Sequence, residues 1–143
     1  MSYIVIALVV IAVGLLVYIR YAPTNAATWH RAEVTFAEAG DYPAIGGFTA
    51  VRVATTGDLA RLIGFIETTD RTRIVAGSVG EGLITYVTRT KVIGFPDYTT
   101  LQIEPVPQSG KIRLTIHGRL RFGRSDLGVN RARIEGWLTL AGL

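Results

Sequence analysis

The longest run of hydrophobic positions lies at the start of the chain, where residues 3–19 contain no charged side chain. A helix rises about 1.5 Å per residue, so continuing this run to residue 22 gives a length close to the roughly 30 Å hydrocarbon core of a bilayer. Tyrosines that could anchor such a helix at the membrane surfaces lie near its ends: Tyr3, Tyr18 and Tyr21. The pattern predicts a transmembrane anchor over residues 1–22 that contacts membrane lipid through residues 3–22.

Two other interpretations of this run are a cleaved signal peptide and a buried core helix. A signal peptide usually has a basic first segment and small residues at its cleavage site, whereas no Lys or Arg precedes residue 3 and Tyr-Ala-Pro-Thr-Asn follows Arg20. A core helix is rarely apolar on every side. The sequence therefore favours a retained anchor.

Residues 23–47 are rich in Ala, Gly, Pro and Thr, and we interpret them as an irregular lead-in to a globular domain over residues 48–143. The first clear element of that domain begins at Thr55 or Thr56, either of which is a suitable helix cap. Apolar residues then recur at the spacing i, i+3, i+4 and i+7: Leu59, Leu62, Ile63 and Ile66. This spacing predicts an amphipathic helix that ends near Thr68.

Apolar and β-branched segments separated by short turns follow this helix. They predict strands over residues 71–77, 83–93, 99–106 and 111–122. Gaps this short favour an antiparallel meander over crossover connections. Residues 129–140 are predicted as a final helix, although the alternation of Arg131, Arg133 and Glu135 also fits a strand. We therefore expect an α+β domain with a four- to five-stranded, mainly antiparallel sheet and two helices.

Composition narrows the functional classes. The 143 residues leave about 120 beyond the anchor, which suits one domain with one core. The formal net charge of +4 is too small to indicate nucleic-acid binding. There is no cysteine, and His30 and His117 have no metal-ligand partners nearby in sequence. We expect no nucleic-acid partner, no metal, no cofactor and no catalytic residue, and we expect His117 to be a surface side chain whose pKa neighbouring cations lower.

One side of the last predicted strand is strongly cationic. Arg113, Arg119 and Arg121 alternate there with apolar side chains, and Arg89 and Lys91 share one side of another predicted strand. Two further arginines complete the candidate binding face: Arg89, Lys91, Arg113, Arg119, Arg121, Arg124 and Arg131. Such a face could bind an anionic ligand, a lipid headgroup or a partner protein. The alternative is a sheet face that is solvated or neutralised by the chain's own acids.

A second cluster lies in the loop before the final predicted helix. Ser125 or Asp126 could cap that helix while Arg124 and Arg131 pair with nearby acids. The segment would then be a structural clasp: Ser125, Asp126, Asn130 and Arg133. The alternative is that these side chains surround an anion at the start of the helix. Aromatic residues elsewhere are candidate interface anchors: Phe95, Tyr98 and Trp29.

Three runs of residues carry a family resemblance. They begin at Arg71 (Arg-Thr-Arg-Ile-Val-Ala-Gly-Ser), at Thr88 (Thr-Arg-Thr-Lys-Val-Ile-Gly-Phe-Pro-Asp-Tyr) and at Arg121 (Arg-Phe-Gly-Arg-Ser-Asp-Leu-Gly-Val-Asn-Arg-Ala-Arg-Ile-Glu). These runs, and the last most specifically, resemble the bacterial family of domain of unknown function number 1499. The resemblance implies a small α+β domain, often attached to or exported across a bacterial membrane. It brings no established activity, substrate or cofactor.

The residues leave open the side of the membrane on which the domain lies. Arg20 and Arg31 follow the hydrophobic run closely, and the positive-inside rule then favours a cytoplasmic domain. An uncleaved signal anchor with a short N-terminal tail, however, delivers its domain across a bacterial inner membrane, and the resemblance to proteins with export-type N-termini implies an extracytoplasmic domain. We expect a single-pass inner-membrane protein with a periplasmic domain, and a cytoplasmic domain is the alternative.

The sequence offers no catalytic constellation. We expect a non-catalytic, membrane-anchored interaction protein, an accessory or assembly subunit whose partners are other subunits of a larger inner-membrane complex. The alternative is a binding module for a lipid or a small anion, which would need a pocket beside the sheet. A hydrolase of unknown substrate ranks last, because the chain supplies only scattered Ser, Asp, Arg and His.

Overall fold

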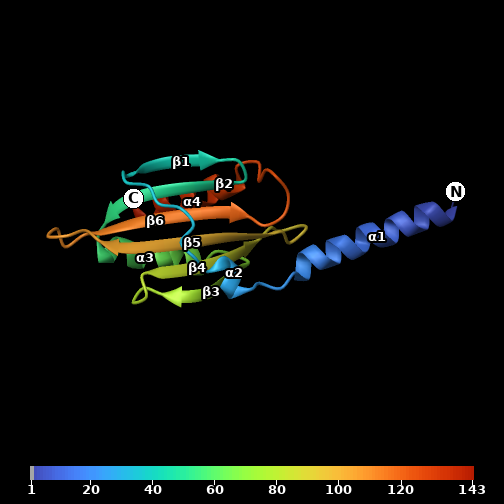
Figure 1. The fold of residues 1–143 in the computed structure, drawn as a ribbon, viewed down its shortest axis with the longest axis horizontal. Helices are drawn as coiled ribbons and strands as arrows, with labels where there is room; N and C mark the ends of the chain where they lie inside the picture. Colours follow the sequence, from blue (N-terminus) through green and yellow to red (C-terminus); the bar gives the residue numbers. More distant parts are fainter. Residues whose placement is uncertain (1) are drawn as a thin grey trace.

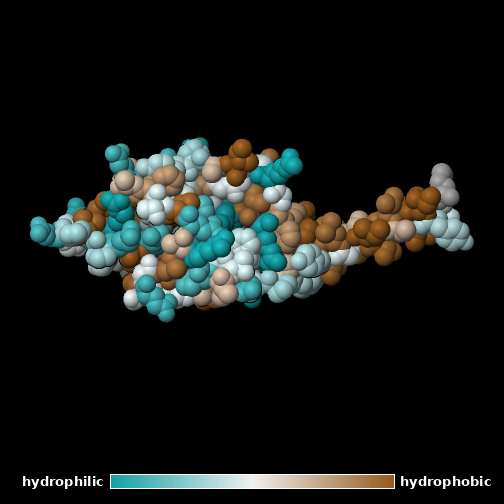
Figure 2. Space-filling model, in the orientation of Figure 1, coloured by the Kyte–Doolittle hydropathy of each residue, from teal (hydrophilic) through white to brown (hydrophobic). Residues whose placement is uncertain are grey.

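A computed structural model of the chain describes residues 2–143, and its first element is the apolar helix α1 (Ser2–Tyr21). The helix extends from one end of the domain along the long axis of the molecule (Figure 1). Of its residues Ile19 alone is buried, so a hydrophobic surface runs along nearly the whole helix (Figure 2). Among the described residues α1 is the one helix long and apolar enough to cross a membrane, which fits a membrane anchor and also a signal sequence.

The domain is built on a six-stranded antiparallel sheet with the strand order β1-β2-β6-β5-β4-β3. The strands are β1 (Gly40–Ala44), β2 (Gly47–Ala54), β3 (Thr72–Ser78), β4 (Leu83–Arg89), β5 (Pro96–Pro105) and β6 (Ile112–Leu120). The expected meander is formed by β3 to β6, because each of these strands pairs with the next one in the chain. The α+β class is therefore confirmed.

The expected count of four to five strands was too low, because the sheet has six and β1 and β2 were not foreseen. Strand β1 lies inside residues 23–47, where an irregular lead-in was expected. Its sequence shows no apolar alternation, and Pro43 is tolerated because β1 is an edge strand. Strand β2 is hard to recognise for the opposite reason. Its residues 48–51 are buried on both faces of the sheet, so they do not show the alternation of apolar and polar residues that marks a half-buried strand.

The strand predicted over residues 83–93 ends earlier, at Arg89. Thr90 Oγ1 accepts hydrogen bonds from the backbone N–H groups of Gly94 (3.2 Å) and Phe95 (2.9 Å), which closes a turn. Gly94 has φ +85°, a left-handed conformation that favours glycine. The loop over residues 90–95 therefore lies at the end of β4, beside the last turn of α1, where a Cβ added to Gly94 would lie 3.1 Å from Arg20 Cγ.

Helices α3 (Thr56–Glu67) and α4 (Val129–Ala141) cover one face of the sheet (Figure 1). Thr55 caps α3 as expected: its Oγ1 accepts from the backbone N–H of Asp58, and the Asp58 carboxylate accepts from the backbone N–H of Thr55. Burying the apolar sides of both helices against the sheet forms one core, which includes Phe48, Leu59, Leu62, Ile66, Tyr86, Leu101, Leu114, Ile116, Ile134 and Trp137.

Residues 129–140 are helical, so the alternative of a strand was wrong. Helix α4 passes over Gly118 of β6, where an added Cβ would lie 2.9 Å from both Asn130 Oδ1 and Ile134 Cδ1. Gly118 therefore permits the close approach of the helix to the sheet. Trp137 fixes the other end of α4 by donating from Nε1 to Thr69 Oγ1 at 2.8 Å.

The second face of the sheet is crossed by residues 23–39, which we call the strap. The strap leaves α1, forms the short helix α2 (Ala26–Trp29) and runs across the strands to β1 (Figure 1). Polar side chains of the second face are buried where it passes: Thr49, Thr85, Thr100 and Thr115. The chain itself therefore covers much of the face on which a cationic surface was expected.

Candidate functional site

Three arginines, Arg113 and Arg119 of β6 and Arg121 just after it, hold the strap by its backbone. Each donates through its guanidinium to a carbonyl oxygen of the strap: Arg121 to Pro23 at 2.7 Å, Arg119 to Trp29 at 2.6 Å and Arg113 to Phe36 at 3.1 Å. A guanidinium carries five N–H donors in a planar fork, so it can satisfy such carbonyls. The alternating arginines that suggested a binding face thus have an intramolecular partner.

Arg119 lies at the centre of this arrangement and is buried. Its Nε lies 2.9 Å from Glu33 Oε2, and its Nη1 donates to Thr100 Oγ1 at 3.0 Å. Its Cζ also lies 5.5 Å from the centroid of the Trp29 ring. A buried charge is costly without a counterion, so Glu33 supplies the compensation that lets Arg119 sit beneath the strap.

Two of the predicted interface anchors pack against each other. Trp29 of the strap stacks on Tyr98 of β5, with ring centroids 4.0 Å apart and planes 10° from parallel. Tyr98 is fully buried and its hydroxyl accepts from Arg121 Nη1 at 3.2 Å. The third predicted anchor, Phe95, lies in the loop after β4, with its centroid 6.5 Å from that of Phe122.

Both histidines lie under or within the strap. His117 Nδ1 shares a 2.8 Å hydrogen bond with Thr49 Oγ1, and its Nε2 lies 3.6 Å from Glu33 Oε2. Burial lowers the pKa of His117, nearby Arg119 lowers it further, and Glu33 opposes both. The expected direction is confirmed, but the expected surface position is wrong, since the side chain is 15% exposed. His30 Nδ1 pairs with Thr85 Oγ1 at 3.0 Å.

Arg89 joins the domain to the end of α1. Its Nη1 donates to Ile19 O at 3.1 Å and to Gly94 O at 3.0 Å, and its Nη2 donates to Ala22 O at 2.7 Å. Arg20 reaches the other way and donates from Nη1 to Val92 O at 3.1 Å. Ile19 and Ala22 are both buried. The end of the helix is therefore held by the domain rather than by a free linker.

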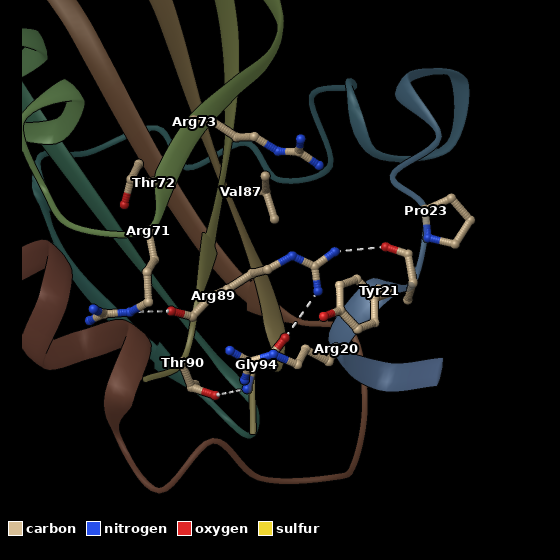
Figure 3. A pocket seen from close by; sticks show the side chains of 11 residues that line it. Arg20, Tyr21, Pro23, Arg71, Thr72, Arg73, Val87, Arg89, Thr90 and Gly94 are labelled. Carbon is tan, nitrogen blue, oxygen red and sulfur yellow. Dashed lines mark hydrogen bonds between the residues drawn. The ribbon is translucent and has the colours of Figure 1, made fainter. Parts of the chain in front are cut away.

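An open cavity of about 560 Å³ lies beside this joint. Its walls come from the end of α1, the first strap residues, β3, β4 and the loop after β4, and they include Arg20, Arg71, Arg73 and Arg89. Arg73 and Arg89 extend from neighbouring strands toward the side on which Tyr21 and Pro23 lie, whereas the Arg71 guanidinium points the other way (Figure 3). No acidic side chain of the described residues lines this cavity.

The remaining cations of the predicted binding face do not line the cavity. Lys91 and Arg124 are exposed on the loops after β4 and β6. Arg131 lies on α4, on the opposite side of the sheet, where its Nε pairs with Glu135 Oε1 at 2.8 Å and its guanidinium lies over the Phe48 ring. The structure therefore divides the predicted set into strap-holding arginines, one residue of the cavity and three outlying residues.

The predicted clasp residues form a connected network at the start of α4. Asp126 Oδ2 accepts from the backbone N–H of Asn130 (2.9 Å) and from its Nδ2 (2.8 Å), while Asp126 Oδ1 accepts from the Gly128 N–H (3.2 Å). Burial acts to raise the pKa of Asp126, but these hydrogen bonds outweigh it and lower the pKa. Ser125 Oγ accepts from the Leu127 N–H at 3.2 Å.

Arg133 extends this network into the sheet. Its Nη1 donates to Asn130 Oδ1 at 3.0 Å, and its Nη2 donates to Asp97 Oδ2 at 3.1 Å. Asp97 is buried, and burial raises its pKa although Arg133 acts to lower it. The Asp126 hydrogen bonds occupy the start of α4, so these side chains bind one another. Of the two arginines expected to pair with acids there, Arg131 pairs with Glu135, and Arg124 pairs with no acid among the described residues.

Sequence reasoning missed three residues that these sites depend on: Glu33, Arg73 and Asp97. Glu33 lies in a segment without periodicity, so nothing linked it to β6. Arg73 lies two positions after Arg71 in the segment predicted as a strand, and that spacing was a usable signal. Asp97 precedes Tyr98 on β5, and a strand assigned from residue 96 would have placed these two side chains on opposite faces.

Within residues 2–143, no group of three or more His, Cys, Asp and Glu side chains is placed to hold a metal ion. The candidate chemistry of the described chain is therefore that of arginine: hydrogen bonding to carbonyl, carboxylate or phosphate oxygens. The strap-holding arginines already donate hydrogen bonds to the strap, whereas arginines of the cavity beside α1 retain free donors.

Comparison with known proteins places the chain in one family. Searches of curated proteins and of solved structures find no match. The family model described as "Protein of unknown function (DUF1499)" matches residues 24–140, which includes the sheet, nearly all of the strap and nearly all of α4 but excludes α1. Because this match covers most of the sequence, the chain belongs to the DUF1499 family.

Proposed function

We propose that this protein is a non-catalytic, membrane-anchored interaction protein that acts as an accessory or assembly subunit of a larger complex in the bacterial inner membrane. The observation that carries the proposal is the fixed joint between α1 and the domain. Arg89 bonds to the carbonyls of Ile19 and Ala22, and Arg20 bonds to that of Val92. A flexible linker would suffice for tethering alone. A held joint also sets the orientation of the domain above the membrane, which docking against neighbouring subunits requires.

The same joint supports a retained anchor over a cleaved signal sequence. Ile19 and Ala22 are buried against the domain, so cleavage after residue 22 would remove a packed segment and two carbonyl partners of Arg89. We assign the domain to the periplasmic side, on the family resemblance to exported proteins. The opposite assignment rests on Arg20 and Arg31 beside the anchor. A C-terminal reporter fusion that is active only in the periplasm distinguishes the two.

The contacts of potentially reactive groups support a non-catalytic role. Ser125 and Asp126 bind backbone N–H groups around the start of α4. His117 is shared between Thr49 and Glu33 beneath the strap. Each group thus has a structural partner, and none of the three lies within hydrogen-bond reach of another.

The test is gentle detergent extraction of the native membrane, followed by size separation and mass spectrometry of the proteins that migrate with this chain. Migration in a large complex at a constant ratio is the expected result. Migration alone, near 15.5 kDa plus detergent, contradicts the proposal. A variant in which residues 3–18 are replaced by an unrelated apolar helix of equal length keeps the joint intact. Loss of the complex in that variant assigns recognition to α1, and its retention assigns recognition to the domain.

A second candidate function is the binding of a lipid or small anion. The cavity beside α1 favours it, because arginine side chains surround this open space without an acidic lining residue in the described chain. This function does not exclude the first, since a subunit of a membrane complex can also bind lipid.

A further inference from the structure

The cavity at the foot of α1 has an uncompensated positive charge. Arg20, Arg71, Arg73 and Arg89 contribute to its walls, and no acidic residue of the described chain does. The nearest ion-pair partner is Asp70, whose Oδ2 lies 3.8 Å from Arg71 Nη1 and whose side chain is 87% exposed. A pair this exposed and this long compensates little of the charge. The cavity therefore attracts anions.

Arginine donors remain free to bind such an anion. The Arg73 side chain makes no hydrogen bond or ion pair with any described residue, and the Arg20 side chain uses one nitrogen, on Val92 O. Arg89 is held by three neutral carbonyls, which orient its guanidinium without cancelling its charge. Burial lowers the pKa of Arg89, and the positive charges of Arg73, Arg121 and Arg20 act in the same direction. An anion placed between Arg73 and Arg89 would relieve this repulsion.

The position of the cavity identifies the kind of anion. Helix α1 has 20 residues and thus a length of about 30 Å, so its C-terminal end, with Arg20 and Tyr21, lies at the level of the lipid headgroups when the helix spans a bilayer. Tyr21 lines the cavity on that side and its side chain is 74% exposed. The cavity thus has cationic walls and lies at the end of a helix whose surface is hydrophobic along most of its length (Figure 2).

We propose that this cavity binds the phosphate group of an anionic phospholipid from the membrane that α1 spans. Arg73 donates to the phosphate oxygens, Arg89 forms the positive wall beside it, and Arg20 adds positive charge at the edge of the cavity (Figure 3). The acyl chains extend past Tyr21 along the apolar surface of α1. A volume of about 560 Å³ accommodates a glycerophosphate headgroup with its first chain carbons. This site requires the retained anchor but no protein partner, so it stands if the chain migrates alone in detergent.

The experiment uses the full chain in non-ionic detergent, with short-chain phosphatidylglycerol, short-chain phosphatidylcholine and inorganic phosphate as separate titrants, followed by calorimetry. Arg73→Gln is the test variant, because Arg73 has no partner among the described residues whose loss could unfold the domain. Lys111→Gln is the matched control, since Lys111 is exposed in the turn before β6, at the other end of the sheet, and its side chain makes no hydrogen bond or ion pair with described residues. Both substitutions remove one positive charge.

Phosphatidylglycerol should bind the wild type more tightly than either other titrant. Arg73→Gln should weaken that binding about tenfold, as expected for a lost charge-assisted hydrogen bond, and Arg73→Lys should recover part of it. Lys111→Gln should leave it unchanged. Equal losses in the Arg73→Gln and Lys111→Gln variants overturn the site. If inorganic phosphate binds as tightly as the lipid and Arg73→Gln weakens both, the cavity is a phosphate site and the lipid is the wrong source. These outcomes do not depend on the subunit proposal, which extraction and mass spectrometry test separately.

Discussion

Arg89 and Ala22 are separated by 67 positions in the sequence, yet Arg89 Nη2 donates a 2.7 Å hydrogen bond to the Ala22 carbonyl. With its bonds to Ile19 O and Gly94 O, this one guanidinium connects the end of α1, the start of the strap and the loop after β4. The arrangement uses the fork of N–H donors that distinguishes arginine from lysine. Helix α1 and the domain are thereby parts of one structure.

Replacing Arg89 with lysine should loosen this joint. Lysine keeps the positive charge but cannot span three carbonyls from one planar group, so we expect a loss of about 1.5–3 kcal/mol in the free energy of unfolding. Hydrogen exchange over residues 19–23 should accelerate. Lys91→Gln, two positions along on an exposed loop, is the control and should change neither quantity. Unchanged exchange in the Arg89→Lys variant would show that the joint does not depend on this side chain.

The strap should detach when Trp29 is truncated. Trp29→Ala removes the stack on Tyr98 and the ring beneath Arg119, and we expect it to cost about 2–3 kcal/mol. Limited proteolysis should then cleave within residues 23–39 faster than in the wild type, while the sheet remains intact. Trp29→Phe retains an aromatic ring and should recover most of the protection. Equal proteolysis of wild type and Trp29→Ala would contradict a strap held by this stack.

Removing one partner of the buried pair Asp97 and Arg133 should strongly destabilise the folded domain. Arg133→Met leaves the Asp97 carboxylate buried without its cation, so we expect a loss of about 3–5 kcal/mol in unfolding free energy. The double variant Asp97→Asn with Arg133→Met removes both charges and should recover much of that loss. Chemical denaturation of the two variants measures the difference. A double variant as unstable as Arg133→Met alone would show that packing, not charge, carries the effect.

Protonation of His117 should destabilise the domain in mild acid. Its pKa is lower in the folded chain than the usual value of about 6.5, because burial and Arg119 disfavour the charged ring while Glu33 only partly compensates. Below about pH 6.5 the unfolded chain therefore binds a proton that the folded chain does not, and stability falls with falling pH. The contribution of neutral His117 to the free energy of unfolding is complete above pH 6.5, and it is lost as the pH decreases toward the pKa of His117 in the folded chain.

The His117→Asn variant tests this pH dependence. Asparagine can still pair with Thr49 through an amide group but does not titrate, so its unfolding free energy should vary less between pH 6.5 and 5. The difference in slope cannot exceed about 1.4 kcal/mol per pH unit, the value for one proton. Identical slopes in the variant and the wild type would assign the acid sensitivity to the carboxylates instead.

The parts of the fold with clear periodicity were predictable. The amphipathic spacing of Leu59, Leu62 and Ile66 and the cap at Thr55 located α3, and the alternation in β6 located the central strand of the sheet. Strand β1 was not predictable because it gains its stability from pairing with β2 and carries no apolar pattern of its own. The periodicity of apolar residues thus identified the helix and the strand that bury one face. Strand β1 instead depends on its pairing with β2.

The candidate site was predictable only in part, for a related reason. The arginines of β6 were recognised, but their partners are backbone carbonyls of the strap, and a carbonyl has no signature in a sequence. The strap-holding role of Arg113 and Arg121 therefore follows only from the structure. Arg20 and Arg73 line one cavity because the end of α1 lies beside β3 and β4, an arrangement that no spacing in the sequence encodes.

The closest approach of α4 to the sheet gives a sharp test of the packing. A Cβ at Gly118 would lie 2.9 Å from both Asn130 Oδ1 and Ile134 Cδ1, so Gly118→Ala must displace the helix or the strand. We expect a loss of about 1–3 kcal/mol in unfolding free energy. Gly136 offers the matched substitution on α4, because nothing lies within 4 Å of an added Cβ there. Gly136→Ala should stabilise the domain by about 0.5–1 kcal/mol through the higher helix propensity of alanine.

The two Gly→Ala changes should shift the unfolding free energy in opposite directions, because the surroundings of the two glycines differ. Thermal unfolding of both variants under one condition measures the difference directly. The displaced helix in Gly118→Ala should also weaken the network of Asn130 and Arg133, so hydrogen exchange at the start of α4 should accelerate in that variant alone. If Gly118→Ala were as stable as the wild type, the helix would not pack over β6 in the register described, and the buried pairing of Arg133 with Asp97 would need another explanation.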